Sequence, residues 1–265
     1  MSRAAVAALH LERDLVLELI DSLSPEEWAL PSDCAGWRVQ DVIAHMAAVY
    51  KSVGGGTVAR ADDAPGDAER NADAGVEERR GWSTADVAAE YREWSTTALA
   101  GLTAMNEEPM ASTVIPLGNL GEHPMHILAN ALVFDHYCHL RHDLLQPAGP
   151  LSRPALPQDD ARLYPIVEWM LGGLPQMCAD GLQALDRPIN LVFTAGGQGD
   201  WVLRPGAPFI TIEPGREHDA AATVTSSTHD FVSWGTQRRP WRALGVFVSG
   251  DEPYAARVLD AINVI

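Results

Sequence analysis

Histidine and aspartate side chains that could bind a metal ion are concentrated in one stretch of the sequence. Five of the nine histidines lie between residues 123 and 142. Asp135 and His139 are four residues apart, so on a helix their side chains lie on one face, one turn from each other. Imidazole nitrogen and carboxylate oxygen are good ligands for a borderline divalent ion such as Zn²⁺. The spacing therefore makes a metal site one interpretation of this segment.

Further residues could complete such a site. His142 lies three residues beyond His139 and could share its face, whereas Asp143 lies four beyond and could orient the His139 ring. His45, in a separate segment, could supply a third ligand. Three protein ligands would leave one coordination position open for water or substrate, as in catalytic zinc sites. The same spacing is most often that of a polar helix face or of core histidines with satisfied hydrogen bonds, and this alternative stays open.

Helices are expected to hold these residues in place. Apolar spacing and helix-ending residues predict helices over about 4–22, 39–52, 83–106 and 124–145. His45 falls in the second of these helices, and Asp135 and His139 fall in the fourth. The polar stretch 60–81 shows little apolar periodicity and is predicted to be a long mobile connection. Four helices with one long excursion predict a four-helix bundle.

The second half of the chain has a different pattern. A proline-rich linker over 151–157 is followed by a predicted helix over 159–185, perturbed by Gly172-Gly173 and Pro175. Short β-type runs follow over 189–194, 201–204, 209–213 and 222–225, with a hairpin turn at 196–199 and closing helices over 228–235 and 252–262. We therefore expect an α+β protein, with a helical bundle at 1–150 and a small α+β domain with an antiparallel sheet at 158–265.

Charge and composition exclude several classes of partner. The 265 residues include 36 acidic and 19 basic side chains, a formal charge of -17 that disfavours nucleic-acid and anionic-membrane partners. No apolar run reaches the length of a membrane span, and the first residues do not resemble a signal peptide. Three scattered cysteines fit a reducing compartment rather than a disulfide framework. We expect a cytoplasmic globular protein.

The segment 33–46, which reads DCAGWRVQDVIAHM, resembles the signature of mycothiol-dependent maleylpyruvate isomerase-like proteins. These proteins belong to the DinB/YfiT-like superfamily of metal-binding bundles, and the resemblance covers about residues 5–150. It implies a zinc site with His45 as the ligand from the second helix. The family pattern E-x3-H on the fourth helix matches Asp135 and His139, with aspartate in place of glutamate.

This sequence departs from the family pattern at two positions of the fourth helix. Because aspartate is shorter than glutamate, His136 or His142 could replace Asp135 as a ligand. The family's H-x2-D continuation places His142 where aspartate is expected, with Asp143 one residue later. These departures keep an alternative function open, in which the protein is a repurposed, non-catalytic member that binds a small ligand without metal.

The resemblance implies a zinc- and thiol-dependent enzyme. Zinc would bind mycothiol or another low-molecular-weight thiol as a thiolate, which is the nucleophilic form. That sulfur could add to an activated alkene and permit cis–trans isomerisation, or it could displace a leaving group as an S-transferase does. Several arginines could bind a small anionic electrophile, although a solvated surface charge is the simpler interpretation of each; they are Arg79, Arg80, Arg141, Arg204, Arg238 and Arg239. By analogy Arg238 and Arg239 are the expected catalytic pair.

Other features have simpler interpretations. The C-terminal part, with Arg239–Leu244 before a final helix, is similar to the sterol-carrier-like domain that many of these proteins carry. Trp37 is expected to pack in the core beside the second helix. Cys34 and Cys138 are expected to be small hydrophobic residues, since no adjacent base is evident from the sequence. The sequence does not indicate an oligomeric state.

Overall fold

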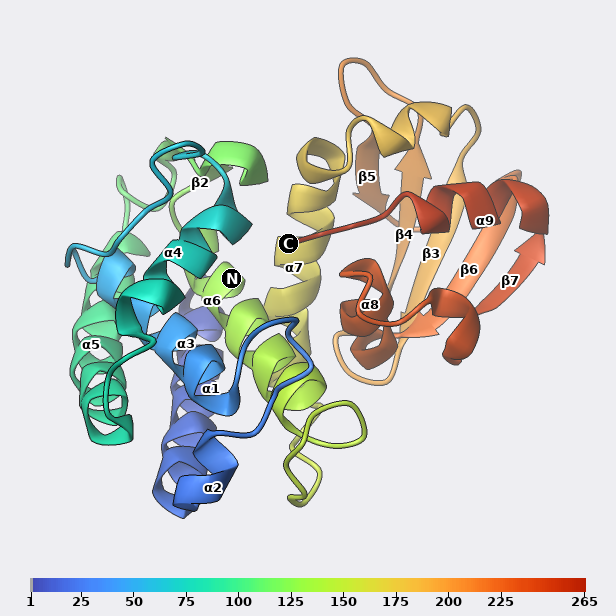
Figure 1. Cartoon of the computed structure of the whole chain (residues 1–265). Coiled ribbons are helices and arrows are strands. Elements are labelled where there is room, and N and C mark those ends of the chain that lie inside the picture. The colour runs from blue at the N-terminus through green and yellow to red at the C-terminus, as the bar shows by residue number, and fades with distance from the viewer. Residues whose placement is uncertain (1) are drawn as a thin grey trace. The chain divides into compact units, whose positions relative to one another are not determined.

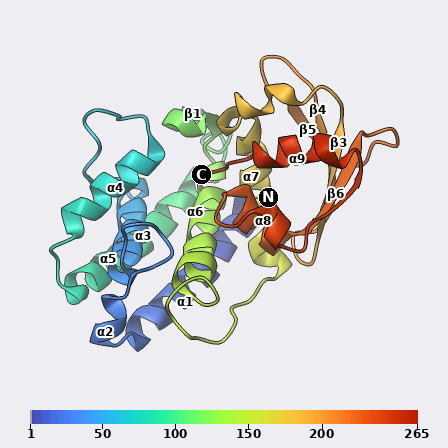
Figure 2. The same cartoon turned by 45° about the vertical axis from the view of Figure 1, so that its right-hand side comes forward.

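The computed structural model describes residues 2–265, which divide into two compact units, one ending at Leu156 and the other spanning Pro157–Ile265. The predicted α+β class is confirmed, since helices dominate the first unit and a five-stranded sheet lies in the second. Four long helices lie side by side in the first unit (Figures 1 and 2). They are α1 (Ser2–Ser22), α3 (Val39–Val53), α5 (Thr84–Met105) and α6 (Ile127–Cys138).

Local signals in the sequence explain where these helices begin and end. The Ser83 side chain accepts a hydrogen bond from the Asp86 backbone and opens α5, as expected for an N-cap. Ser24 caps the short helix α2 (Pro25–Trp28), in which Glu27 completes a capping box. Gly54 follows the last residue of α3. The bundle core is apolar and fully buried at positions such as Leu9, Ile43, Met46 and Leu102.

The segment 60–81 is not the mobile connection that its composition suggested. It contains helix α4 (Ala68–Arg79), which packs on α3. Val76 and Arg79 are buried, and the Arg79 guanidinium donates two hydrogen bonds to the Glu90 carboxylate. A buried ion pair, rather than an apolar stripe, therefore fixes this helix, which is why apolar periodicity did not reveal it.

The fourth predicted helix is more complex than expected. Strands β1 (Val114–Pro116) and β2 (Glu122–Pro124) form an antiparallel hairpin before α6 begins. After Cys138 the helix continues as a π-helical turn over His139–Leu144. Such turns often lie at functional sites. Here the turn carries His139 and Asp143.

The second unit contains the sheet, in the order β5-β4-β3-β6-β7. Its strands are β3 (Ile189–Thr194), β4 (Gly199–Arg204), β5 (Thr211–Pro214), β6 (Ala222–Ser227) and β7 (Phe247–Gly250). All pairs are antiparallel except β3 with β6, which is parallel. The predicted hairpin turn joins β3 to β4, where Gly196 and Gly197 adopt φ values of 81° and 57°.

Helices α7 (Asp160–Met177), α8 (Thr228–Gly235) and α9 (Glu252–Asp260) complete the second unit. The expected interruption of α7 at Gly172-Gly173 and Pro175 does not occur, because the helix continues to Met177. Phe231 of α8 stacks on Phe193 of β3 in the core of this unit. Within the described residues 2–265, no helix combines the length and apolarity that a membrane span requires.

Candidate metal site

The three residues predicted to bind metal lie together in the first unit. His45 Nε2 lies 2.9 Å from Oδ1 of Asp135, and His139 Nε2 lies 3.5 Å from the same oxygen. One donor atom from each residue lies within 4.8 Å of the other two. Helix α3 supplies His45, α6 supplies Asp135, and the π-helical turn supplies His139. The i,i+4 spacing thus brings Asp135 and His139 together, and the packing of α3 against α6 adds His45.

This group is mostly buried but remains open to solvent. The exposed fractions of the His45, Asp135 and His139 side chains are 11%, 19% and 10%. Oδ2 of Asp135 is buried and has no hydrogen-bond partner among residues 2–265. Nδ1 of His136 lies 3.3 Å from this oxygen and also hydrogen bonds to the Leu132 carbonyl. A buried carboxylate oxygen without a donor is costly unless a cation compensates it.

The charges within the group stabilise one another. Burial alone would raise the pKa of Asp135, but His45 and His139 outweigh this effect and hold its pKa well below the usual range. Burial alone would lower the pKa of His139, but Asp135 and then Asp143 raise it well above the usual range. In the metal-free protein Asp135 is therefore an anion and His139 a cation, so the two form a buried ion pair.

The donor set suits a divalent ion such as Zn²⁺. Zinc binds imidazole nitrogen and carboxylate oxygen at about 2.0–2.2 Å in tetrahedral geometry, which puts neighbouring ligand atoms about 3.4 Å apart. The 3.5 Å separation of His139 Nε2 from Asp135 Oδ1 is close to that value, whereas the 2.9 Å separation of His45 Nε2 from the same oxygen is that of a hydrogen bond. The shorter aspartate side chain reaches the group without difficulty. His136 and His142, the alternative ligands, belong to neither of the candidate metal-binding groups found among residues 2–265.

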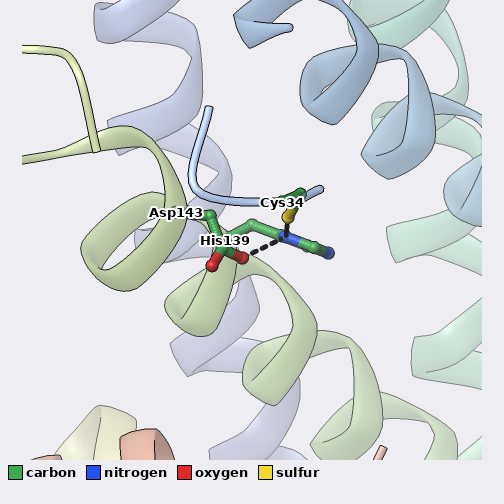
Figure 3. A group of neighbouring side chains, drawn as sticks. All are labelled: Cys34, His139 and Asp143. Carbon is green, nitrogen blue, oxygen red and sulfur yellow. Dashed lines mark hydrogen bonds and ion pairs between the residues drawn. The ribbon is translucent and has the colours of Figure 1, made fainter. Parts of the chain in front are cut away.

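A second group of possible donors shares His139. Nδ1 of His139 donates a hydrogen bond to Oδ2 of Asp143 at 2.8 Å and lies 3.7 Å from Sγ of Cys34 (Figure 3). Cys34 therefore has an imidazole beside it, which the sequence alone did not indicate. The loop that carries Cys34 is fixed to the π-helical turn, because the Asp33 backbone N–H donates to the Asp143 carbonyl at 3.0 Å. The contact joins residues 105 positions apart, so no local pattern indicates it.

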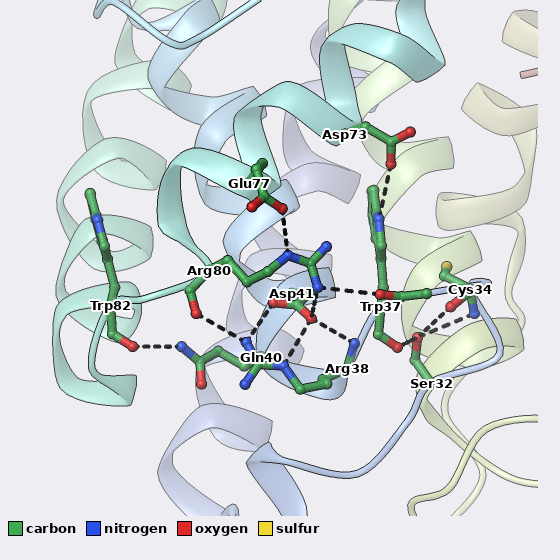
Figure 4. A network of polar contacts seen from close by, with 11 residues as sticks. Ser32, Cys34, Trp37, Arg38, Gln40, Asp41, Asp73, Glu77, Arg80 and Trp82 are labelled. Atoms are coloured by element: carbon green, nitrogen blue, oxygen red, sulfur yellow. Dashed lines mark hydrogen bonds and ion pairs between the residues drawn. The ribbon is translucent and has the colours of Figure 1, made fainter.

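Trp37 contacts the site rather than the core alone. It is half-buried, and its ring centroid lies 5.1 Å from that of His45 and 6.3 Å from that of His139. The indole N–H donates to Asp73 Oδ1 of α4 at 3.1 Å (Figure 4). The loop before α3 is held by Arg38, whose guanidinium makes two hydrogen bonds to Asp41 at 2.9 Å and 3.0 Å. The expectation that Trp37 packs in the core therefore missed its contacts with the site and its hydrogen bond to Asp73.

A family comparison decides the family of the chain. The model of the mycothiol maleylpyruvate isomerase N-terminal domain matches residues 9–143, which is half of the chain. The chain belongs to this family. The matched range of this family member contains every residue of the candidate metal site. No match was found among curated proteins.

Solved structures support the fold of this family member. It is similar to a crystal structure of the mycothiol-dependent maleylpyruvate isomerase, with 13% identity and a TM-score of 0.53. A structure of a single-residue alanine mutant of that enzyme gives 12% identity and a TM-score of 0.54. Each comparison covers 94% of this chain and 93% of the other. At this identity the similarity establishes the fold.

The predicted arginines do not all belong to the unit that holds the metal site. Arg238 and Arg239 follow α8 in the second unit, where their backbone N–H groups donate to the Ser233 carbonyl. Two other candidates are buried in ion pairs, Arg79 with Glu90 and Arg141 with Glu12. These two arginines stabilise the first unit and are not available to bind a substrate anion.

Proposed function

We propose that this protein is a metal- and thiol-dependent enzyme, with Zn²⁺ held by His45, Asp135 and His139. The thiol is mycothiol or another low-molecular-weight thiol. The reaction is cis–trans isomerisation or S-transfer on a small, anionic electrophile. Family membership supports the thiol and the isomerase-like chemistry, because the family model is named for a mycothiol-dependent isomerase. When bound, the metal ion would lower the pKa of a coordinated thiol and supply a thiolate near neutral pH.

The observation that carries the proposal is the convergence of two imidazoles and one carboxylate in a nearly buried site. Asp143 accepts the Nδ1 proton of His139, which leaves Nε2 as the nitrogen that faces Asp135. Asp135 remains ionised and supplies a negative charge to the cation. Three protein ligands leave room for a thiol at a further coordination position.

The substrate anion needs a positive partner besides the metal. Arg238 and Arg239 stay the proposed pair, in keeping with the analogy that singled them out. Both residues follow α8 and belong to the second unit. Replacing both with glutamine would remove the charges and keep hydrogen-bonding capacity. We expect the KM for an anionic substrate to rise while the metal content stays unchanged.

An assay of the zinc-loaded protein tests the function directly. Maleylpyruvate isomerisation would be measured with and without mycothiol, and thiol transfer would be measured with 1-chloro-2,4-dinitrobenzene. We expect at least one activity to require both thiol and metal. His45→Ala should abolish it, whereas His218→Ala should not, since the His218 side chain is 99% exposed. Full activity of His45→Ala, or activity without thiol, would refute the proposal.

A further inference from the structure

The π-helical turn over His139–Leu144 carries two residues of the candidate site, the proposed ligand His139 and its hydrogen-bond acceptor Asp143. The wide winding of the turn is seen in the Leu145 N–H, which donates to the Leu140 carbonyl five residues before it at 3.1 Å. Such winding is rare compared with that of an α-helix. Contacts outside the turn must therefore favour it.

A buried ion pair connects the middle of this turn to α1. Arg141 is the third residue of the turn, and its guanidinium donates to both carboxylate oxygens of Glu12, at 2.7 Å and 3.0 Å. The side chains of Arg141 and Glu12 are 4% and 0% exposed. Cζ of Arg141 also lies 3.8 Å from the centre of the Tyr137 ring, four residues earlier. The guanidinium is therefore held by two contacts, one to α1 and one to α6.

This ion pair is well suited to fix the register of the turn. Breaking a buried pair destabilises a protein, whereas replacing both partners with apolar residues of similar size is often neutral or stabilising. A buried pair is thus not needed for stability as such. Its two parallel hydrogen bonds do require one geometry, because the guanidinium fork matches the carboxylate. A shift of one residue along an α-helix would turn Arg141 by about 100° around the axis, away from Glu12.

We propose that Glu12 is a positioning residue for the metal site. Through Arg141 it fixes the register of the π-helical turn, and so the places of His139 and Asp143. This inference rests on the proposed function, since it takes His139 as a metal ligand. It adds α1 to the elements that build the site, although α1 supplies none of the three proposed ligands. Glu12 and Arg141 act through the backbone of the turn rather than by contact with the ion.

A double substitution separates the register of the turn from the stability of the protein. Glu12→Leu combined with Arg141→Met replaces the ion pair with apolar side chains, so we expect the midpoint of urea denaturation to stay close to that of wild type. The zinc affinity, measured by competition with a chelator, should fall by about 10- to 100-fold, as when a residue that orients a ligand is removed. The visible absorption spectrum of the Co²⁺ form should also change, because it depends on where His139 lies.

Two further variants complete the test. Arg141→Lys keeps the positive charge but cannot make the bidentate contact, so it should fold and show a smaller loss of zinc affinity in the same direction. It carries the test if the double variant does not fold. Arg79→Met is the control for lost stability, because it breaks a second buried arginine–glutamate pair, with Glu90. It should lower the urea midpoint and leave the Co²⁺ spectrum unchanged.

The outcomes separate this inference from the proposed function. Lower zinc affinity and an altered Co²⁺ spectrum in a folded double variant, or in Arg141→Lys, support the inference. Wild-type affinity and spectrum in these variants overturn it and leave the metal-dependent function standing. An equal spectral change in Arg79→Met, or failure of Arg141→Lys to fold, also overturns it, because the pair would then act through stability alone. If wild type binds neither zinc nor cobalt, the proposed function itself fails.

Discussion

Nδ1 of His139 lies 2.8 Å from Oδ2 of Asp143, one turn further along the same helical segment. Asp143 is almost fully buried, with a side chain that is 2% exposed. The contact fixes the orientation of the imidazole, so that Nε2 faces Asp135. Carboxylates that orient a ligand histidine in this way are a regular feature of metal sites.

This contact predicts a graded effect of substitutions at Asp143. Asp143→Ala removes the acceptor, and we expect the zinc affinity to fall by about 10- to 100-fold. Asp143→Asn keeps an acceptor oxygen without the charge and should give an intermediate affinity. Competition with a chelator of known affinity measures both values. Equal zinc affinities in wild type and Asp143→Ala would show that the carboxylate does not orient the ligand.

Zinc affinity should increase with pH across the neutral range. In the metal-free protein the pKa of His139 is raised well above its usual value by Asp135 and Asp143, despite the opposing effect of burial. His139 is therefore protonated at neutral pH and must lose a proton before it can bind metal. Release of one proton gives about a tenfold gain in affinity per pH unit below the His139 pKa. An affinity that is constant from pH 6 to 8 would contradict this protonation state.

Cobalt substitution should distinguish the two donor groups that share His139. If His45, Asp135 and His139 hold the ion, the Co²⁺ protein should show no sulfur-to-metal charge-transfer absorption until an external thiol is added. Cys34→Ser should then leave the spectrum unchanged. If Cys34, His139 and Asp143 hold the ion instead, the band should appear without added thiol and disappear in Cys34→Ser.

The buried pair of Arg79 and Glu90 should contribute strongly to stability. Their side chains are 0% and 6% exposed. Arg79→Met would leave Glu90 with Lys51 as a partial partner, and we expect a loss of about 3 kcal/mol in the free energy of unfolding. The exposed pair of Arg70 and Asp63 is a matched control. Arg70→Met should cost less than about 1 kcal/mol. Urea denaturation measures both, and similar costs would show that α4 is not anchored by its ion pair.

Local sequence patterns predicted much of the fold. Helix α8 and strand β3 have the predicted bounds, because a cap or a glycine-rich turn limits each. Helix α4 was not predicted, because ion pairs rather than a stripe of apolar residues hold it against the bundle. The parallel pairing of β3 with β6 also escaped, since strand order depends on contacts between residues far apart in sequence.

In the site too, the contact between residues close in sequence was predicted, and the contacts between distant residues were not. The i,i+4 spacing of Asp135 and His139 indicated a shared face, and the structure places them on it. His45 was a possible third ligand from its own helix, and the family resemblance supported that choice, because nothing in either segment alone specifies how α3 packs on α6. Cys34 and Trp37 were missed as neighbours of His139, since both contacts span about a hundred residues.

The zinc content of the purified protein tests the central claim most directly. Inductively coupled plasma mass spectrometry would be applied to wild type, His45→Ala, His139→Ala and the surface control His218→Ala, purified without added metal or chelator. We predict about one equivalent of zinc per chain in wild type and His218→Ala, and less than about a tenth of an equivalent in the other two. Full zinc content in His45→Ala and His139→Ala, or none in wild type even after zinc is added, would contradict the account.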